Sequence, residues 1–213
     1  MSALIELKNV GYKVKDKIIL NNINLKINAG SKTTFVGPSG AGKSTLVRLI
    51  ARMISYTSGS ITYKGKEIID YEPTLYRQKV SYCFQQPTLF GNTVRDNLNF
   101  PFVVRKKKPD QTKIIQALKS VNLSDDFLDK GITELSGGER QRVAMLRNII
   151  FQPDVLIIDE VSAGLDVNNR EIINHLINTI NQKGVTILQI THDEDEINNA
   201  QNIIRMNSGK LVQ

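Results

Sequence analysis

Cysteine is almost absent from this sequence, and no apolar run approaches the roughly 18 residues that a membrane-spanning helix needs. The single Cys83 cannot form an internal disulfide and lies in an apolar stretch, which favours a buried thiol in a reducing compartment. Residues 1–8 lack the basic start and apolar core of a signal peptide. Internal repeats, low-complexity tracts and coiled-coil insertions are also missing. These absences argue against disulfide-stapled, membrane-spanning and repeat architectures.

The composition is that of an ordinary soluble globular protein, with 40% hydrophobic and 23% charged residues among 213. The formal net charge is +7, and the densest basic run is one arginine and three lysines at residues 105–108. That run is short and has no interleaved aromatic residues. A solvated face or a membrane-proximal patch therefore explains it better than nucleic-acid binding.

One stretch, residues 37–45, fits the pattern G-x-x-x-x-G-K-[ST] between an expected strand at 33–36 and an expected helix at 43–52. Glycines allow the backbone to approach an anion closely, and the start of the helix adds free N–H donors. The lysine would reach the β- and γ-phosphates, and the serine after it would bind Mg²⁺. The predicted phosphate-binding residues are Gly37, Pro38, Ser39, Gly40, Ala41, Gly42, Lys43, Ser44 and Thr45. A glycine-rich turn that fits by chance is the alternative.

Strands and helices alternate along most of the chain, which predicts an α/β fold with a mostly parallel sheet. Residues 87–150 are more helical and more polar, and we interpret them as a helical subdomain inserted into a single domain spanning residues 1–213. The expected strands are 4–10, 18–20, 23–27, 33–36, 61–63, 79–84, 154–158, 185–190, 202–206 and 211–212, with turns at 58–60 and 207–209. The expected helices are 43–52, 94–98, 111–121, 123–128, 168–182 and 193–200, with one more after residue 136.

Two carboxylates, Asp159 and Glu160, close the apolar strand at 154–158. Ligands bind at the carboxyl ends of central parallel strands, so these side chains point to a site. Asp159 is placed to hold Mg²⁺, and Glu160 to orient and polarise an attacking water. Two acids that merely cap the next turn are the alternative.

A second glycine-rich helix start lies at residues 135–142, with the sequence LSGGERQR. Ser136 and Glu139 could form a capping box. Stability does not require Gly137 and Gly138, since each glycine costs about 1 kcal/mol against alanine in a helix. A bare helix end that presses against an anion explains them, and it would complete the nucleotide site of another copy.

Together, these motifs resemble the ATP-binding subunit of an ATP-binding-cassette transporter, and the resemblance covers essentially the whole chain. It implies a P-loop NTPase fold with an N-terminal antiparallel β-subdomain and an inserted helical subdomain. It also implies ATP and Mg²⁺ as cofactors, a separate transmembrane permease as partner, and a place on the cytoplasmic face of the cell membrane. Two copies would face head to tail as a homodimer, with ATP between residues 37–45 of one and Ser136, Gly137 and Gly138 of the other.

The same resemblance suggests roles for single residues. Tyr12, expected in a turn, would stack on adenine, although a strand-end tyrosine that packs on its own sheet is the alternative. Glu160, His192 and Gln85 would be catalytic, and Ser44, Gln85 and Asp159 would hold the metal. For His192, a strand-end histidine with its hydrogen bonds satisfied is the alternative. Leu165 and Asp166 would communicate across the dimer. Val161 and Gly164 depart from the usual proline and alanine, which puts fine geometry in doubt.

A narrower resemblance is to the ATPase of bacterial Fet-type iron exporters, which implies iron as cargo. Another cargo, such as a different metal, a lipid or a peptide, remains open, as does a soluble ATPase acting on DNA or the ribosome. The permease would dock on residues 87–97 through Leu89, Phe90 and Val94. The narrower resemblance rests on NVGY at 9–12, NNIN at 21–24, YRQ at 76–78, VSYC at 80–83, PTLFG at 87–91, TVRDNL at 93–98, FP at 100–101 and THDEDEI at 191–197.

Overall fold

A six-stranded sheet forms the centre of the molecule in the computed structural model, which describes residues 3–212. Its order is β10-β9-β3-β8-β7-β6, and all neighbours run parallel except β10, which is antiparallel to β9. Every residue of β7 and β8 is buried. The predicted α/β fold with a mostly parallel core sheet is therefore confirmed. The strands are β3 (Lys32–Val36), β6 (Val80–Cys83), β7 (Val155–Asp159), β8 (Thr186–Ile190), β9 (Asn202–Asn207) and β10 (Lys210–Val212).

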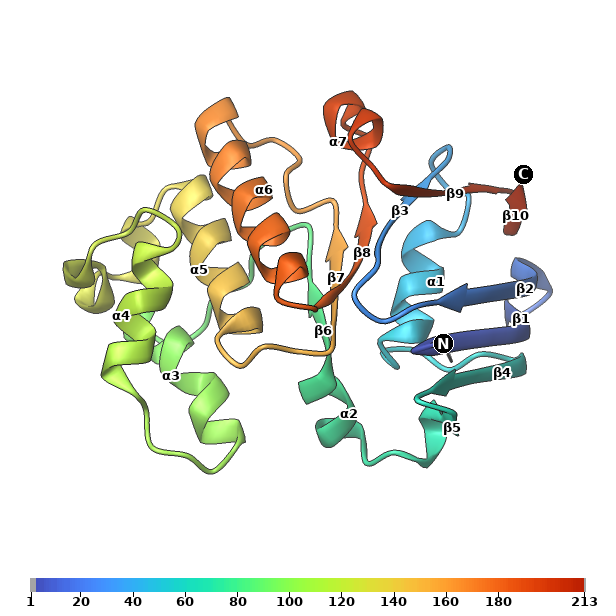
Figure 1. Ribbon diagram of the computed structural model, residues 1–213, viewed down its shortest axis with the longest axis horizontal. Helices are drawn as coiled ribbons and strands as arrows, with labels where there is room; N and C mark the ends of the chain where they lie inside the picture. Colours follow the sequence, from blue (N-terminus) through green and yellow to red (C-terminus); the bar gives the residue numbers. More distant parts are fainter. Residues whose placement is uncertain (1–2, 213) are drawn as a thin grey trace.

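The two faces of this sheet carry separate hydrophobic cores, because successive side chains of a strand point to opposite sides. Val155 and Ile157 of β7 join the core that contains α1, whereas Leu156 and Ile158 join the core that contains α5 and α6. Figure 1 shows α6 and α1 flanking the sheet. The helices next to the sheet are α1 (Lys43–Ile50), α2 (Pro73–Lys79), α5 (Gly137–Ile149), α6 (Val167–Gln182) and α7 (Glu194–Asn198).

A second, antiparallel sheet in the order β2-β1-β4-β5 packs on the α1 side of the core. Two predicted boundaries inside it are wrong. Residues 18–20 and 23–27 form one strand, which continues through Asn22 at a φ of 52°. Residues 58–60, expected as a turn, belong to β4, where Ser60 pairs with Lys8. The strands are β1 (Ile5–Val14), β2 (Lys17–Ile27), β4 (Ser58–Tyr63) and β5 (Lys66–Glu67).

Tyr12 lies inside β1 and not in a turn, so its predicted placement is wrong. It pairs with Leu20 of β2, next to irregularities in the strand register. Its ring is half-buried and packs against the first core. The packing expected of a tyrosine on its own sheet is therefore present.

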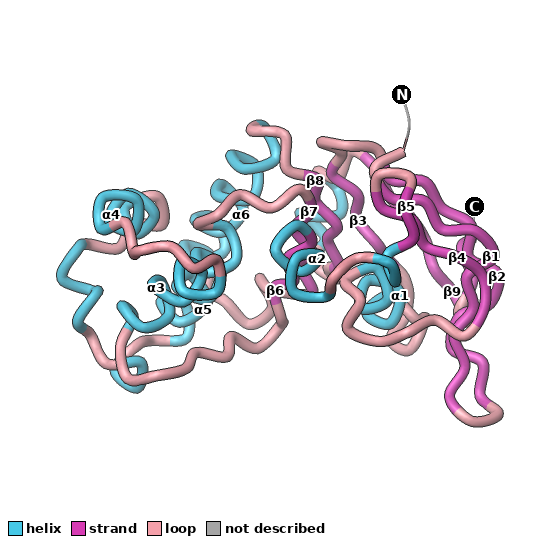
Figure 2. The backbone as a smooth tube through the Cα atoms, turned by 90° about the horizontal axis from the view of Figure 1, so that it is seen from below, coloured by secondary structure: helices cyan, strands magenta, loops and turns pink. Residues whose placement is uncertain are grey.

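Helices dominate residues 94–149, which lie at the end of the molecule opposite the antiparallel sheet (Figure 2). They include α3 (Val94–Val104), α4 (Gln111–Lys119), α5 and two short 3-10 segments, Asp125–Asp129 and Ile132–Glu134. The helix expected at 94–98 continues to Val104 through Pro101, and the one expected at 123–128 is the first 3-10 segment.

The docking surface predicted at residues 87–97 needs a correction. Val94 is the first residue of α3, and its side chain is fully buried in the second core. Leu89 packs against the same core, and of the three predicted residues only Phe90 is exposed. Two of the three apolar residues predicted to meet the permease therefore pack into the chain's own second core.

Helix α2 was not expected, although Glu72 caps it and Pro73 occupies its first turn. Cys83 is buried, as predicted, and burial raises the pKa of its thiol to about 12. No helix within residues 3–212 is both long and apolar enough to cross a membrane.

Candidate active site

Residues 37–42 form a tight loop between β3 and α1, and the backbone there requires glycine. Gly42, the N-cap of α1, has a φ of 98°, and a Cβ at this position would lie 2.7 Å from Leu20 Cδ2. Gly37 has a φ of 149°, and a Cβ there would collide with the carbonyl of Met206. The loop is therefore pressed between β2 and β9.

Two adjoining cavities lie at the carboxyl ends of the parallel strands. The larger holds about 530 Å³ and the smaller about 280 Å³, and both are lined by Ser44 and Glu160. Ligands of parallel sheets bind at this edge. The larger cavity is also lined by residues 39–43, Thr45, His192, Lys17, Ile18, Ile19, Ser208 and Gly209. The smaller is also lined by Arg48, Phe84, Gln85, Gln86, Thr88 and Asp159.

Lys43 places a cation at the floor of the larger cavity. Its side chain is buried, and its Nζ donates to the carbonyl oxygens of Gly37 at 2.7 Å and Pro38 at 3.1 Å. Burial lowers the pKa of Lys43, while the carboxylates of Glu160 and Asp159 act in the opposite direction. The ammonium is thus held by neutral carbonyls, which an anion could replace.

Asp159 and Ser44 bring two oxygen donors together where the cavities meet. Ser44 Oγ lies 3.1 Å from Asp159 Oδ1. The Tyr82 hydroxyl donates to the other carboxylate oxygen, and Arg48 Nη2 lies 4.0 Å from it. Burial raises the pKa of Tyr82, and the bond to Asp159 adds to the shift, so the phenol stays a donor. A carboxylate and a hydroxyl are hard oxygen ligands of the kind that Mg²⁺ prefers.

Glu160 is the centre of a second polar group. Gln85 Nε2 donates to its Oε2 at 3.0 Å, and His192 Nε2 lies 3.3 Å from its Oε1. Glu160 has a φ of 53°, a region that non-glycine residues rarely adopt, while its N–H donates to Ile190 O at 3.0 Å. Glu160 is therefore held in an uncommon backbone conformation directly after the end of β7. The three residues predicted to be catalytic therefore meet at one carboxylate.

Two predicted binding elements do not join this group within one chain. Tyr12 is not among the described residues that line either cavity, and neither are Ser136, Gly137 and Gly138. The expected capping box between Ser136 and Glu139 is present at the start of α5. Gly137 is exposed, whereas a Cβ on Gly138 would collide with the Asn169 side chain.

Several residues of the site were missed by the sequence reasoning. Arg48 and Tyr82 support Asp159, but neither belongs to a recognisable spacing. The turn after β9 supports the loop from behind, since Gly209 N donates to Ala41 O at 3.1 Å and Asn21 N donates to Gly209 O at 2.9 Å. Nothing in the sequence beyond a turn signal at 207–209 points to that contact.

Comparison with known proteins matches residues 20–163 to the family model described as "ABC transporter". The chain is 45% identical over 206 residues to the "Probable iron export ATP-binding protein FetA" of Escherichia coli (strain K12), covering 96% of this chain and 92% of that protein. It is 36% identical to the "Spermidine/putrescine import ATP-binding protein PotA" of Spiroplasma citri, covering 99% of this chain but 61% of that protein. Among solved structures, the dimeric post-hydrolysis state of the ATP-binding cassette MJ0796 bound to ADP and Pi superposes with a TM-score of 0.87 and 28% identity, covering 98% of this chain and 97% of that one.

Proposed function

The chain belongs to the ABC transporter family as an ATP-binding domain, and from that premise we propose that it energises the export of iron through a separate membrane-spanning subunit. It is an ATP hydrolase coupled to transport. The observation that supports the ATP-hydrolysing part of the proposal is the meeting of Lys43, Asp159 and Glu160 around two adjoining cavities, next to a glycine-rich helix start.

We assign the triphosphate to the larger cavity. The N–H groups of residues 37–45 would bind its oxygens, and Lys43 would exchange the carbonyls of Gly37 and Pro38 for the β- and γ-phosphates. Ser44, Asp159 and Gln85 would hold Mg²⁺, which when bound neutralises charge on the phosphate oxygens. Tyr82 and Arg48 fix the orientation of the Asp159 carboxylate.

We assign the hydrolytic step to Glu160. Its carboxylate would accept a hydrogen bond from water and orient that water toward the γ-phosphate. Gln85 Nε2 donates to one oxygen of this carboxylate and His192 Nε2 lies 3.3 Å from the other, so both side chains would help to orient it. His192 lines the same cavity and would contact the γ-phosphate.

The adenine remains assigned to Tyr12. Tyr12 pairs with Leu20 of β2, the residue that follows Ile19 at the rim of the cavity. Ile18 at the same rim is 64% exposed and offers an apolar surface beside a ring. The base would thus lie against the β1–β2 hairpin, while the phosphates lie on the loop.

A second copy would complete the site. The ATP-binding cassette MJ0796 is dimeric in its post-hydrolysis state. Ser136 and Gly137 are exposed at a helix start, and neither is among the described residues that line the two cavities of the site. In a head-to-tail homodimer they would bind the γ-phosphate held by the partner's loop.

Iron as cargo rests on the similarity to FetA, because among residues 3–212 no group of three His, Cys, Asp or Glu side chains could hold a metal ion. A strain lacking this chain is expected to accumulate iron, measured by elemental analysis of washed cells. The wild-type gene should restore the iron content, and the Glu160→Gln variant should not. Unchanged iron together with altered polyamine content would replace iron export with the activity named for PotA.

The membrane subunit would dock in a groove between the core and the helical insertion, which would place this chain at the membrane surface. Two cavities of about 350 and 270 Å³ adjoin there and are both lined by Arg77, Ser81 and Asn148. Their apolar walls include Phe84, 46% exposed, and Phe100, 44% exposed. Phe90 packs edge-to-face against Phe100 at a centroid distance of 4.7 Å. Gln85 follows Phe84 directly and lines the smaller cavity of the site. Gln85 would therefore connect a subunit docked at this groove to the site.

Replacing Phe90 and Phe100 together with aspartate is expected to abolish co-purification with the membrane subunit, because two charges would enter an apolar contact. ATP binding by the isolated chain should stay within about twofold, since additive effects hold for distant sites. The matched control is Val14→Asp, at a residue 48% exposed in the β1–β2 hairpin. Unchanged co-purification of the double variant would refute this docking surface.

A further inference from the structure

Several polar contacts hold the segment that follows His192. Helix α7 follows His192 directly, and none of its residues, all within the described range 3–212, is buried. Asp193 caps the helix, its Oδ1 accepting from Glu196 N at 3.1 Å. Gln189 of β8 donates to Glu196 Oε2 at 2.8 Å. Buried β8 anchors the chain up to Thr191, and beyond it these polar contacts position the segment next to His192.

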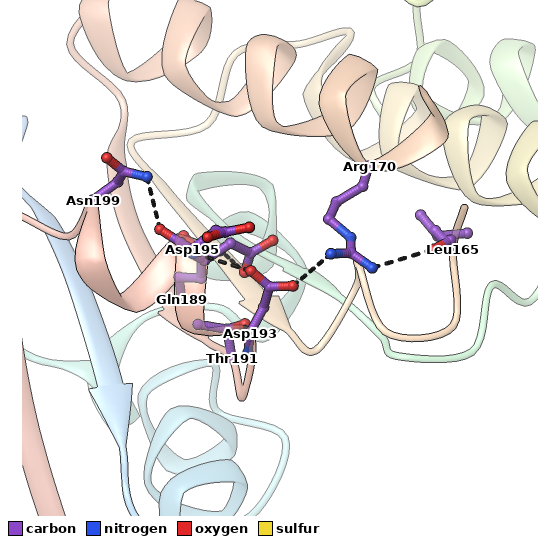
Figure 3. Close-up of polar contacts among 8 residues, drawn as sticks. Leu165, Arg170, Gln189, Thr191, Asp193, Asp195 and Asn199 are labelled. Atoms are coloured by element: carbon purple, nitrogen blue, oxygen red, sulfur yellow. Dashed lines mark hydrogen bonds and ion pairs between the residues drawn. The ribbon is translucent and has the colours of Figure 1, made fainter. Parts of the chain in front are cut away.

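Arg170 supplies the shortest of these polar contacts, from a different element. It lies in the first turn of α6, and its guanidinium points between two loops (Figure 3). Nη1 lies 2.7 Å from Asp193 Oδ2, and Nη2 donates to Leu165 O at 3.4 Å. The side chains of Arg170 and Asp193 are 33% and 21% exposed, so water screens this ion pair only in part.

Both of the loops that Arg170 contacts begin next to a residue of the site. Leu165 follows Glu160 by five residues, in the segment expected to face the second copy. Asp193 adjoins His192, whose Nε2 lies 3.3 Å from Glu160 Oε1. From this geometry we infer that Arg170 is a positioning residue: it fixes His192 against Glu160 and ties that contact to the 161–166 loop. This inference rests on the proposed ATP hydrolysis.

The chemistry of the contact requires arginine. A planar guanidinium has donors in a fixed fork and holds a carboxylate and a carbonyl at once. A lysine at position 170 would keep the positive charge, but all of its N–H donors lie on a single nitrogen. If contact with a second copy moves the 161–166 loop, the two contacts of the Arg170 guanidinium would pass this movement to His192. The positive charge alone would not.

The test uses steady-state hydrolysis and nucleotide affinity of the purified chain. Arg170→Met is expected to lower kcat about tenfold. It should leave the Kd for ATP within about twofold, because neither cavity is lined by Arg170 in the part of the chain that the structure describes. Asp193→Asn probes the same contact from the other side, since asparagine keeps the N-cap acceptor and removes the charge. Arg170→Lys should recover part of the rate.

The matched control is Arg95→Met, which removes the exposed ion pair of 2.8 Å with Asp129 in the helical insertion. Its kcat should equal that of the wild type.

A double-mutant test with His192 distinguishes a positioning role of Arg170 from a general effect of Arg170 on the stability of the fold. In a His192→Ala background, Arg170→Met should change the single-turnover rate by less than about twofold, because the residue through which it acts is gone. A full tenfold loss in that background, or wild-type kcat in both Arg170→Met and Asp193→Asn, would overturn the inference. A wild-type chain without ATP hydrolysis would instead overturn the proposed function.

Discussion

Replacing Glu160 with glutamine is expected to lower kcat by about 100-fold or more, because the variant loses the carboxylate that would polarise water. Its amide oxygen can still accept the Gln85 Nε2 hydrogen bond, which measures 3.0 Å in the wild type. ATP affinity should therefore be kept, and unhydrolysed ATP should hold two copies together. Turnover is measured by phosphate release, and the oligomeric state by light scattering with ATP and Mg²⁺.

Glu171→Gln is the matched control, since Glu171 is exposed on α6 and loses the same charge. It should turn over like the wild type and dimerise no more than the wild type does. A Glu160→Gln variant that stays monomeric at saturating ATP would contradict the head-to-tail arrangement. Wild-type kcat in that variant would remove Glu160 from the chemistry.

The residues of the site that sequence predicted best are those whose geometry is local. Residues 37–45 and the pair Asp159 and Glu160 need only one strand, its end and the next turn to be placed. Such short patterns carry their own structural context. His192 follows a buried strand, but that place alone does not predict its role, which came from the resemblance to the family.

The supporting contacts depend on how distant elements pack, and sequence spacing does not encode this. Tyr82 reaches Asp159 because β6 pairs with β7 in the register that sets Tyr82 opposite Ile157. Arg170 reaches Asp193 across 23 residues, through the packing of α6 beside β8. The sequence shows which residue type stands at such a position, but it does not show which distant residue the side chain contacts.

The errors in the fold have a similar origin. Tyr12 was placed in a turn because its neighbours are polar, yet β1 is exposed on one side and tolerates polar residues there. Val94 was assigned to a surface because it stands in a polar loop, yet α3 turns it into the second core. Local polarity predicts exposure of a segment, but the face that each residue presents depends on the partner element.

Lys43→Ala is expected to abolish most ATP binding, because the cation that would face the β- and γ-phosphates is removed. Truncating one partner of a close charge pair costs several kcal/mol, so the Kd should rise about 100-fold. At an ATP concentration of about 100 times the wild-type Kd, binding stabilises the wild type by about 2.7 kcal/mol. The variant would gain only about 0.4 kcal/mol under the same conditions. The ATP-induced shift in Tm measures this difference.

The shift, and not the Tm of the ligand-free chain, is diagnostic, because Lys43 also contributes to the empty site. Its Nζ donates to Gly37 O and Pro38 O, while burial lowers its pKa and opposes its charge. The control is Lys17→Ala, an exposed lysine that lines the same cavity from the β1–β2 hairpin. Since a rim charge is screened by water, Lys17→Ala should keep most of the ATP-induced shift. A full shift in Lys43→Ala would show that the triphosphate does not lie on the loop at residues 37–45, and the assignment of the larger cavity would then be wrong.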